Sequence, residues 1–202
     1  MNIVEIFPIK IAVIDDFECS QEIVDALNNV ECVAPSNNDV AKFSLDTYIF
    51  DNLFYDSLSS KIIEQVNYYA NALQLRNNKM QFAQSWVTQC TPGLHHRIHS
   101  HTNSVISGVY YFDTDSHSSP LMFHRGGLTD IRVNTLEAED DHDTFVLPSS
   151  KNRLVLFPSY LTHSVPMNMF KRDRRSVAFN CLPIGRLGNE RSLCEIRYDR
   201  LK

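Results

Sequence analysis

The sequence contains little glycine, no cysteine pair, no excess of positive charge and no long apolar run. Six of its 202 residues are glycine, whereas twelve are phenylalanine and eight are tyrosine, an aromatic excess that favours β-sheet. The five cysteines are scattered and never spaced as CxxC, which argues against a disulfide framework or a zinc knuckle. The formal net charge of -5 argues against a general nucleic-acid-binding protein, which would carry a basic face.

Targeting and membrane signals are missing as well. The opening residues, MNIVEIFPIKIAVIDDFE, show no basic stretch followed by an apolar stretch, so a signal peptide is not expected. No apolar run approaches the roughly 20 residues that a membrane span requires. The sequence therefore predicts no membrane association and a cytoplasmic location.

The first part of the chain predicts two strands and two helices. Residues 2–14 hold two apolar runs separated by Pro8, which is typical of strands with a break between them. Residues 20–30 begin with a capping serine and continue with apolar residues at helical spacing, which predicts a short helix. Residues 56–75 place their apolar side chains on one face, which predicts a longer helix packed across a sheet.

After residue 79 the pattern changes to short apolar runs separated by turns. Many short strands at this spacing predict a sandwich, a jelly roll or a barrel. We therefore expect a mainly β protein with N-terminal helices, folded as a single domain over 1–202. Residues 1–79 would form a strand and helix support, 80–183 the β core, and 184–202 a C-terminal strand extension.

The segment from Leu94 to Phe112 contains four of the eight histidines directly before a probable buried strand. In an extended segment His99 and His101 lie on the same face, so their imidazoles can converge on one metal ion such as Fe, Zn, Cu or Ni. A third ligand must come from elsewhere, and His163 is the best candidate, with His124 as its competitor.

The remaining histidines have simpler interpretations. His95 and His96 precede the extended run and are interpreted as surface loop residues. His117 flanks a strand pair and can be structural. His142 lies in an acidic loop, where charged residues are usually solvated.

Arg174, eleven residues after His163, lies in a basic segment that suggests an anion site. Four alternate residues of the following strand share one face: Arg174, Ser176, Ala178 and Asn180. A guanidinium that points into a barrel is costly to bury without an anion, and its planar fork suits a carboxylate. Arg175 falls on the opposite face and is interpreted, with Lys171 and Arg172, as part of a solvated turn.

These features resemble the iron(II)/2-oxoglutarate-dependent dioxygenases. More narrowly, the chain is similar to a prolyl-hydroxylase-like subgroup of mostly uncharacterised bacterial and phage proteins. The similarity covers about residues 80 to 183, and four motifs carry it: SWV at 85–87, HSHTNSVISGVYYF at 99–112, LFPSYLTHSV at 156–165 and RRSVAFN at 174–180.

The resemblance implies a double-stranded β-helix (jelly roll) that holds Fe(II) at one open end. His99 and His101 match the family's His-x-Asp/Glu pair, and His163 matches its distal histidine. Arg174 and Ser176 match the pair that binds the far carboxylate of 2-oxoglutarate. Residue Tyr111 lies where related enzymes place a tyrosine against that carboxylate.

One position departs from the family pattern, because His101 stands where an aspartate or glutamate is usual. Either the site is a three-histidine facial triad, which the resemblance to the subgroup favours, or one histidine lies outside the coordination sphere and a water or an acid from elsewhere completes it. The resemblance implies a hydroxylase that uses Fe(II), 2-oxoglutarate and O2 in a bacterial or phage-infected cell. Trp86, Phe112, Phe123 and Phe157 would wall its pocket or simply fill the core.

The sequence is also compatible with two other functions. One is a cupin-like metal-binding jelly roll, although a cupin needs no inward Arg-x-Ser after its last metal histidine. The other is a structural or phage protein that keeps the fold without activity.

The substrate, whether a small molecule or a peptidyl group, is not encoded in these motifs; the loop at 116–120 and the acidic loop near Asp140 are the expected specificity elements. The strand edges weakly favour a homodimer.

Overall fold

Eight strands of the core wind between two facing antiparallel sheets, with four of them in each sheet. The computed structural model describes residues 1, 8–35, 40–75, 79–114, 117–125 and 144–197. The core strands are β4 (Met80–Cys90), β5 (His96–His99), β6 (Ile106–Asp113), β7 (Leu121–His124), β8 (Thr144–Leu147), β9 (Arg153–Pro158), β10 (His163–Val165) and β11 (Arg174–Pro183). One sheet contains the order β9-β6-β11-β4 and the other the order β5-β10-β7-β8. This winding is a double-stranded β-helix, as predicted.

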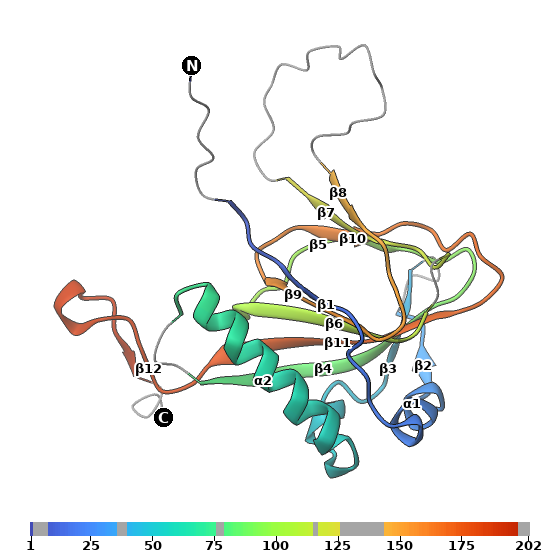
Figure 1. Cartoon of the computed structure of the whole chain (residues 1–202), viewed down its shortest axis with the longest axis horizontal. Helices are drawn as coiled ribbons and strands as arrows, with labels where there is room; N and C mark the ends of the chain where they lie inside the picture. Colours follow the sequence, from blue (N-terminus) through green and yellow to red (C-terminus); the bar gives the residue numbers. More distant parts are fainter. Residues whose placement is uncertain (2–7, 36–39, 76–78, 115–116, 126–143, 198–202) are drawn as a thin grey trace.

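Segments outside the core extend the larger sheet at both edges. The strand β1 (Ala12–Ile14) pairs with β9, and β3 (Lys42–Ser44) pairs with β4 and with β2 (Cys32–Val33), which completes a seven-stranded sheet. At the C-terminal end β12 (Arg186–Leu187) and β13 (Ile196–Arg197) form a separate two-stranded sheet. Figure 1 shows the two core sheets stacked, with β12 projecting to one side.

Two α-helices form where the apolar spacing predicts them. The helix α1 (Gln21–Asn28) begins after Ser20, whose hydroxyl accepts a hydrogen bond from the Ile23 N–H. Three short 3-10 helices span Ile49–Asp51, Leu53–Tyr55 and Glu190–Ser192. The longer helix α2 (Asp56–Ala72) lies across the face of the seven-stranded sheet that points away from the smaller sheet (Figure 1).

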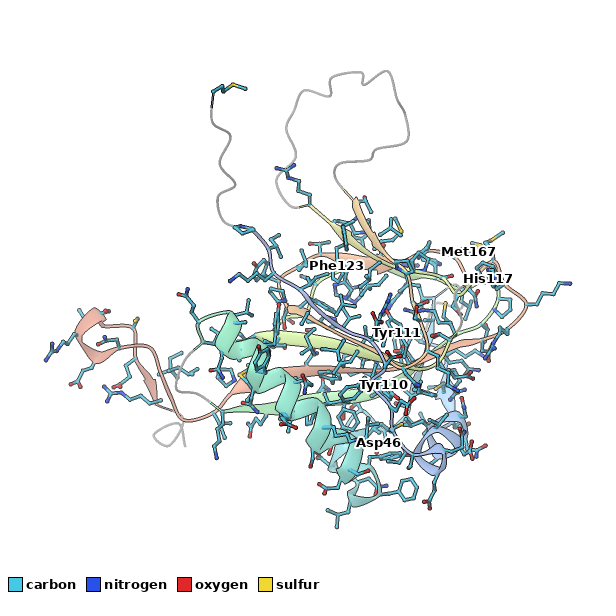
Figure 2. The ribbon with its side chains drawn as sticks, viewed as in Figure 1. Asp46, Tyr110, Tyr111, His117, Phe123 and Met167 are labelled. Atoms are coloured by element: carbon cyan, nitrogen blue, oxygen red, sulfur yellow. The ribbon has the colours of Figure 1, made fainter. Side chains whose placement is uncertain are left out.

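Strict alternation along the strands produces two separate apolar layers. Tyr110 belongs to the layer between the seven-stranded sheet and the helices, together with Leu58 and Ile62 of α2. Its neighbour Tyr111 belongs to the layer between the two sheets, together with Phe123. Figure 2 shows Tyr110 and Tyr111 directed to opposite sides of the sheet. The pocket described below lies in the second layer.

Arg175 was expected in a solvated turn, but its side chain is buried. Alternation does place it on the face opposite Arg174, but that face is covered by α1, so the side chain is buried and not solvated. Its guanidinium donates hydrogen bonds to the carbonyl oxygens of Leu27 at 3.3 Å and Val30 at 2.7 Å. Arg175 thus satisfies backbone carbonyls at the C-terminal end of α1.

Several predicted features lie outside the described residues. These are the first strand of 2–14, the acidic loop with Asp140 and His142, and Ser116 at the start of one specificity loop. Among the described residues, no helix has the length and apolar character to cross a membrane. The domain boundaries, the homodimer and the cytoplasmic location stay predictions.

Gly108 shows how tightly β6 packs against the helix-side layer. A Cβ atom built on Gly108 would lie 2.3 Å from Cζ of Phe179 and 2.8 Å from Cδ2 of Leu156. The Phe179 ring is itself held between Phe50 and Phe82, at centroid distances of 6.1 and 5.5 Å. The ring therefore has little freedom to move aside.

We expect the Gly108→Ala substitution to lower the free energy of unfolding by about 1–3 kcal/mol because the added methyl group overpacks this layer. Urea denaturation followed by circular dichroism measures the change. Gly93→Ala is the matched control, since Gly93 has a φ of +84° but no heavy atom within 4 Å of its Cβ position. A smaller loss for Gly108→Ala than for Gly93→Ala would contradict the packing argument.

Candidate metal and co-substrate site

A pocket opens between the two sheets, and its lining combines imidazoles at one end with a guanidinium at the other. The lining residues come from both sheets: Trp86, Thr88, His96, His99, His101, Gly108, Val109, Tyr111, Leu121, Phe157, His163, Val165, Arg174, Ser176 and Ala178. All six predicted site residues are among them. The loop residue His95, adjacent to His96, is not.

His99, His101 and His163 form the imidazole end. One ring nitrogen from each lies within 4.8 Å of the others, and among the described residues this group contains no carboxylate or thiolate. His99 and His163 are directly opposite each other in the pairing of β5 with β10. His101 lies beyond the end of β5, so strand alternation does not place it. The backbone N–H of His101 donates a hydrogen bond to the Ser159 carbonyl at 2.9 Å, which fixes the segment that carries His101.

Hydrogen bonds to the backbone set the orientation of two of these rings. Nδ1 of His99 lies 2.7 Å from the Arg97 carbonyl oxygen, and Nδ1 of His163 lies 2.9 Å from that of Leu161. A carbonyl can only accept, so each Nδ1 carries the proton and donates. Each Nε2 then presents a lone pair, which is the usual arrangement of a metal-binding histidine.

Burial keeps two of the rings neutral at physiological pH. Desolvation, with a smaller effect from His99, lowers the pKa of His163 to about 3 and that of His101 to about 4. A neutral imidazole is the form that binds a metal. The Nε2 atoms of His101 and His163 are 3.2 Å apart. Two nitrogens bound at about 2.1 Å on adjacent corners of an ion's coordination shell stand about 3 Å apart, so this donor set fits an ion.

His96 was interpreted as a surface loop residue, but it is part of a strand and lines the pocket. It begins β5, where His99 pairs with His163 and His96 pairs with Val165, so three steps along β5 match two steps along β10. This β-bulge turns His96 onto the same face as His99, with the ring centroids 4.4 Å apart. Burial, followed by the effect of His99, lowers the pKa of His96 to about 3.

His124 and His117 lie away from the triad. Nε2 of His124 is 2.8 Å from the Ser164 hydroxyl, and both residues alternate with the pocket-facing residues of their strands. His124, the competitor for third ligand, is therefore not brought to the triad. His117 is exposed and its ring lies 6.0 Å from that of Phe170.

Arg174 forms the opposite end of the pocket. Its side chain is buried, and its Nη2 donates to the Tyr111 hydroxyl at 3.1 Å, with the guanidinium carbon 4.8 Å from the centre of the Tyr111 ring. Among the described residues, its Nε has no hydrogen-bond partner and no acidic residue forms an ion pair with it. Ser176, two residues along the same face, is also buried in the lining. A buried guanidinium in this state is prepared for an external anion.

Three serine hydroxyls form a hydrogen-bond network behind His101 that no sequence pattern predicts. Ser159 Oγ lies 2.8 Å from the hydroxyls of both Ser104 and Ser107, and Ser107 donates to Oδ1 of Asn180 at 2.8 Å. Scattered serines carry no periodic signal that would have joined them. The network fixes the segment whose carbonyl holds His101.

The expected aromatic walls divide between the two layers. Trp86 and Phe157 line the pocket, with ring centroids 6.0 and 6.5 Å from that of His101. Phe123 packs against Phe157 from the smaller sheet, while Phe112 lies in the layer under the helices. Three of the four therefore surround the site and one fills the core.

Comparison with known families agrees with this geometry. Residues 84–180 match the family model described as "Putative 2OG-Fe(II) oxygenase". The matched segment contains the three convergent histidines and Arg174, so over these residues the chain is similar to the 2OG-Fe(II) oxygenases. No curated protein sequence matches the chain significantly.

Several solved structures share the fold at low sequence identity. HygX from Streptomyces hygroscopicus, crystallised with nickel, 2-oxoglutarate and hygromycin B, is 11% identical, with a TM-score of 0.61 over 87% of this chain and 83% of that one. A prolyl-4-hydroxylase from Pseudomonas putida is 16% identical, with a TM-score of 0.57 over 85% and 92%. A Trichoplax adhaerens prolyl hydroxylase, bound to a hypoxia inducible factor peptide, is 16% identical, with a TM-score of 0.58 over 84% and 82%.

The geometry of the triad predicts that removing any one of its imidazoles weakens metal binding. We expect His99→Ala, His101→Ala and His163→Ala each to lower Ni(II) affinity by about 10- to 100-fold or more, measured by calorimetry on metal-free protein. His124→Ala is the matched control and should bind as wild type does. Unchanged affinity in His101→Ala would exclude a three-histidine site.

Proposed function

We propose that the protein is an Fe(II)- and 2-oxoglutarate-dependent dioxygenase that hydroxylates a C–H bond of its substrate and releases succinate and CO2. The observation that carries this proposal is the pairing of two features in one pocket. Three convergent imidazoles lie at one end, and a buried guanidinium without an anionic partner among the described residues lies at the other.

The proposed metal ligands are His99, His101 and His163, each through Nε2. Arg174, Ser176 and the Tyr111 hydroxyl would hold the far carboxylate of 2-oxoglutarate. Iron(II) with 2-oxoglutarate and dioxygen supplies an oxidative decarboxylation, in which one oxygen atom enters succinate and the other enters the substrate C–H bond.

The residues of this chain serve that chemistry by positioning and by excluding water. The hydrogen bonds from Nδ1 of His99 and His163 to backbone carbonyls keep both Nε2 lone pairs directed into the pocket. The apolar side chains of Val109, Leu121 and Val165 line the pocket beside these polar groups and exclude bulk water from it.

The polarity of the pocket suggests where the substrate would enter. Arg174 is opposite Cys90 in the pairing of β11 with β4, whereas Ala178 is opposite Trp86, next to His101. The co-substrate would therefore occupy the Arg174 end and the substrate the Trp86 end.

The buried guanidinium argues against a cupin-like binding protein or an inactive structural protein. Burying a charge without an anion is costly, and a protein that binds no carboxylate gains nothing in return. Arg174 lines the pocket, and its guanidinium donates only to the Tyr111 hydroxyl among the described side chains, which is the arrangement expected when a ligand completes the site.

Arg174→Met is expected to weaken 2-oxoglutarate binding to Ni(II)-loaded protein by about 100-fold, because a charge-assisted bidentate contact is lost. The melting temperature should stay the same or rise, since an uncompensated buried charge is removed. Arg172→Met, at an exposed position two residues away, is the matched control for binding. Calorimetry and thermal denaturation measure the two effects, and equal 2-oxoglutarate affinity in both variants would exclude the assigned role.

Turnover tests the enzyme assignment itself. Protein reconstituted anaerobically with Fe(II) and then exposed to O2 is expected to convert 2-oxoglutarate to succinate, with no succinate formed without iron or without oxygen. Arg174→Met should reduce this conversion strongly, while Arg172→Met should not. Succinate quantified by mass spectrometry is the readout. Its absence from iron-loaded wild-type protein that binds 2-oxoglutarate would favour the non-catalytic alternative.

A further inference from the structure

His96 occupies a position in the pocket that the proposed ligands and the Arg174 anion site do not explain. Its ring lies against that of His99, at a centroid distance of 4.4 Å, and against that of Phe43 at 5.4 Å. It is part of the pocket lining but not of the group of three nitrogens that converge on an ion. Within the described part of the chain, neither ring nitrogen of His96 has a hydrogen-bond partner.

The strand register places His96 between the triad and the guanidinium. On β10, His163 pairs with His99 and Val165 pairs with His96, so His96 is one pair further along than the triad. Continuing in the same direction, the Asn168 side chain donates to the Cys90 carbonyl at 2.8 Å, and Cys90 is the register partner of Arg174. His96 therefore lies on the path from the triad to Arg174.

The bulge in β5 is what brings His96 to this path. Without the extra residue, period-two alternation from His99 would direct Arg97 into the pocket and His96 out of it. A bulge disrupts the ladder locally, and bulges are frequent beside functional sites, where they redirect one side chain. Here the redirected side chain is an imidazole whose N–H has no acceptor among the residues that the structure describes.

We propose that His96 positions the co-substrate by donating a hydrogen bond to its metal-proximal carboxylate. This inference rests on the proposed function, because it requires 2-oxoglutarate to lie between the triad and Arg174. A carboxylate that binds an ion through one oxygen keeps its second oxygen free to accept. The imidazole of His96, which is in ring contact with His99, would lie beside that oxygen. Arg174, Tyr111 and Ser176 would instead contact the far carboxylate at the other end of 2-oxoglutarate.

This role makes His96 a positioning residue and gives it a distinct dependence on ligand structure. Pyruvate carries the same 2-oxo acid group as 2-oxoglutarate but lacks the far carboxylate. A contact to the proximal carboxylate is common to both molecules, so loss of the His96 N–H should weaken both by the same factor. A contact to the far carboxylate, as proposed for Arg174, affects 2-oxoglutarate alone.

Calorimetric titration of full-length, Ni(II)-loaded protein tests the assignment without turnover. His96→Phe keeps a ring against Phe43 but removes the donor, and His96→Gln keeps a donor. His95→Phe is the matched control, because His95 is the neighbouring histidine outside the lining. We expect His96→Phe to weaken 2-oxoglutarate and pyruvate each by about tenfold or more, His96→Gln to recover part of the loss, and His95→Phe to match wild type.

Each remaining outcome overturns the assignment in a recognisable way. Wild-type affinity for 2-oxoglutarate in His96→Phe would leave His96 as a core residue only. Weaker Ni(II) binding in the absence of any 2-oxo acid would make His96 a metal ligand instead. A loss confined to 2-oxoglutarate would place the contact at the far carboxylate.

Failure of the proposed function itself looks different, because wild-type Ni(II) protein would then bind neither 2-oxo acid and Arg174→Met would have no effect. That result would overturn the His96 assignment along with the function. If circular dichroism shows His96→Phe to be unfolded, His96→Leu replaces it in the same comparison with His96→Gln, and the same outcomes decide.

Discussion

The pairing of His99 with His163 across β5 and β10 is the contact on which the candidate site depends. These two strands belong to the smaller sheet, and their register places two imidazoles directly opposite each other on the inner face. Backbone carbonyls of Arg97 and Leu161 then orient the rings. A shift of one residue in this register would turn one imidazole to the outer face and leave two histidines of the triad, instead of three, in the pocket.

The larger sheet supplies the second half of the site through the same alternation. Arg174 and Arg175 are adjacent, yet one guanidinium faces the pocket without an anion among the described residues and the other binds carbonyl groups at the end of α1. Three neutral imidazoles add no negative charge to Fe(II), unlike the usual set with one carboxylate. The two carboxylates of 2-oxoglutarate would therefore face an iron centre with more net positive charge at one end and Arg174 at the other, which favours a dianionic ligand of this length.

The sequence predicted those parts of the site that depend on alternation and on family motifs. His99, His163, Arg174 and Ser176 line one pocket as expected, and the helices over 20–30 and 56–75 formed as α1 and α2. It did not predict the position of His96 in the pocket, because a β-bulge depends on pairing with a distant strand and leaves no local pattern. The burial of Arg175 was missed for a similar reason, since only the packing of α1 against β11 covers that face. His101 was predicted correctly as a pocket residue, but a turn held by Ser159 places it, rather than strand alternation.

The central claim is that one pocket holds iron through three histidines and 2-oxoglutarate between iron and Arg174. A crystal structure of the protein grown anaerobically with Fe(II) and 2-oxoglutarate tests this claim most directly. We expect Nε2 of His99, His101 and His163 on the iron, the 2-oxo acid group chelated beside His96, and the far carboxylate on the Arg174 guanidinium. Iron bound by fewer than three of these histidines, or a 2-oxoglutarate carboxylate that does not reach Arg174, would contradict the account.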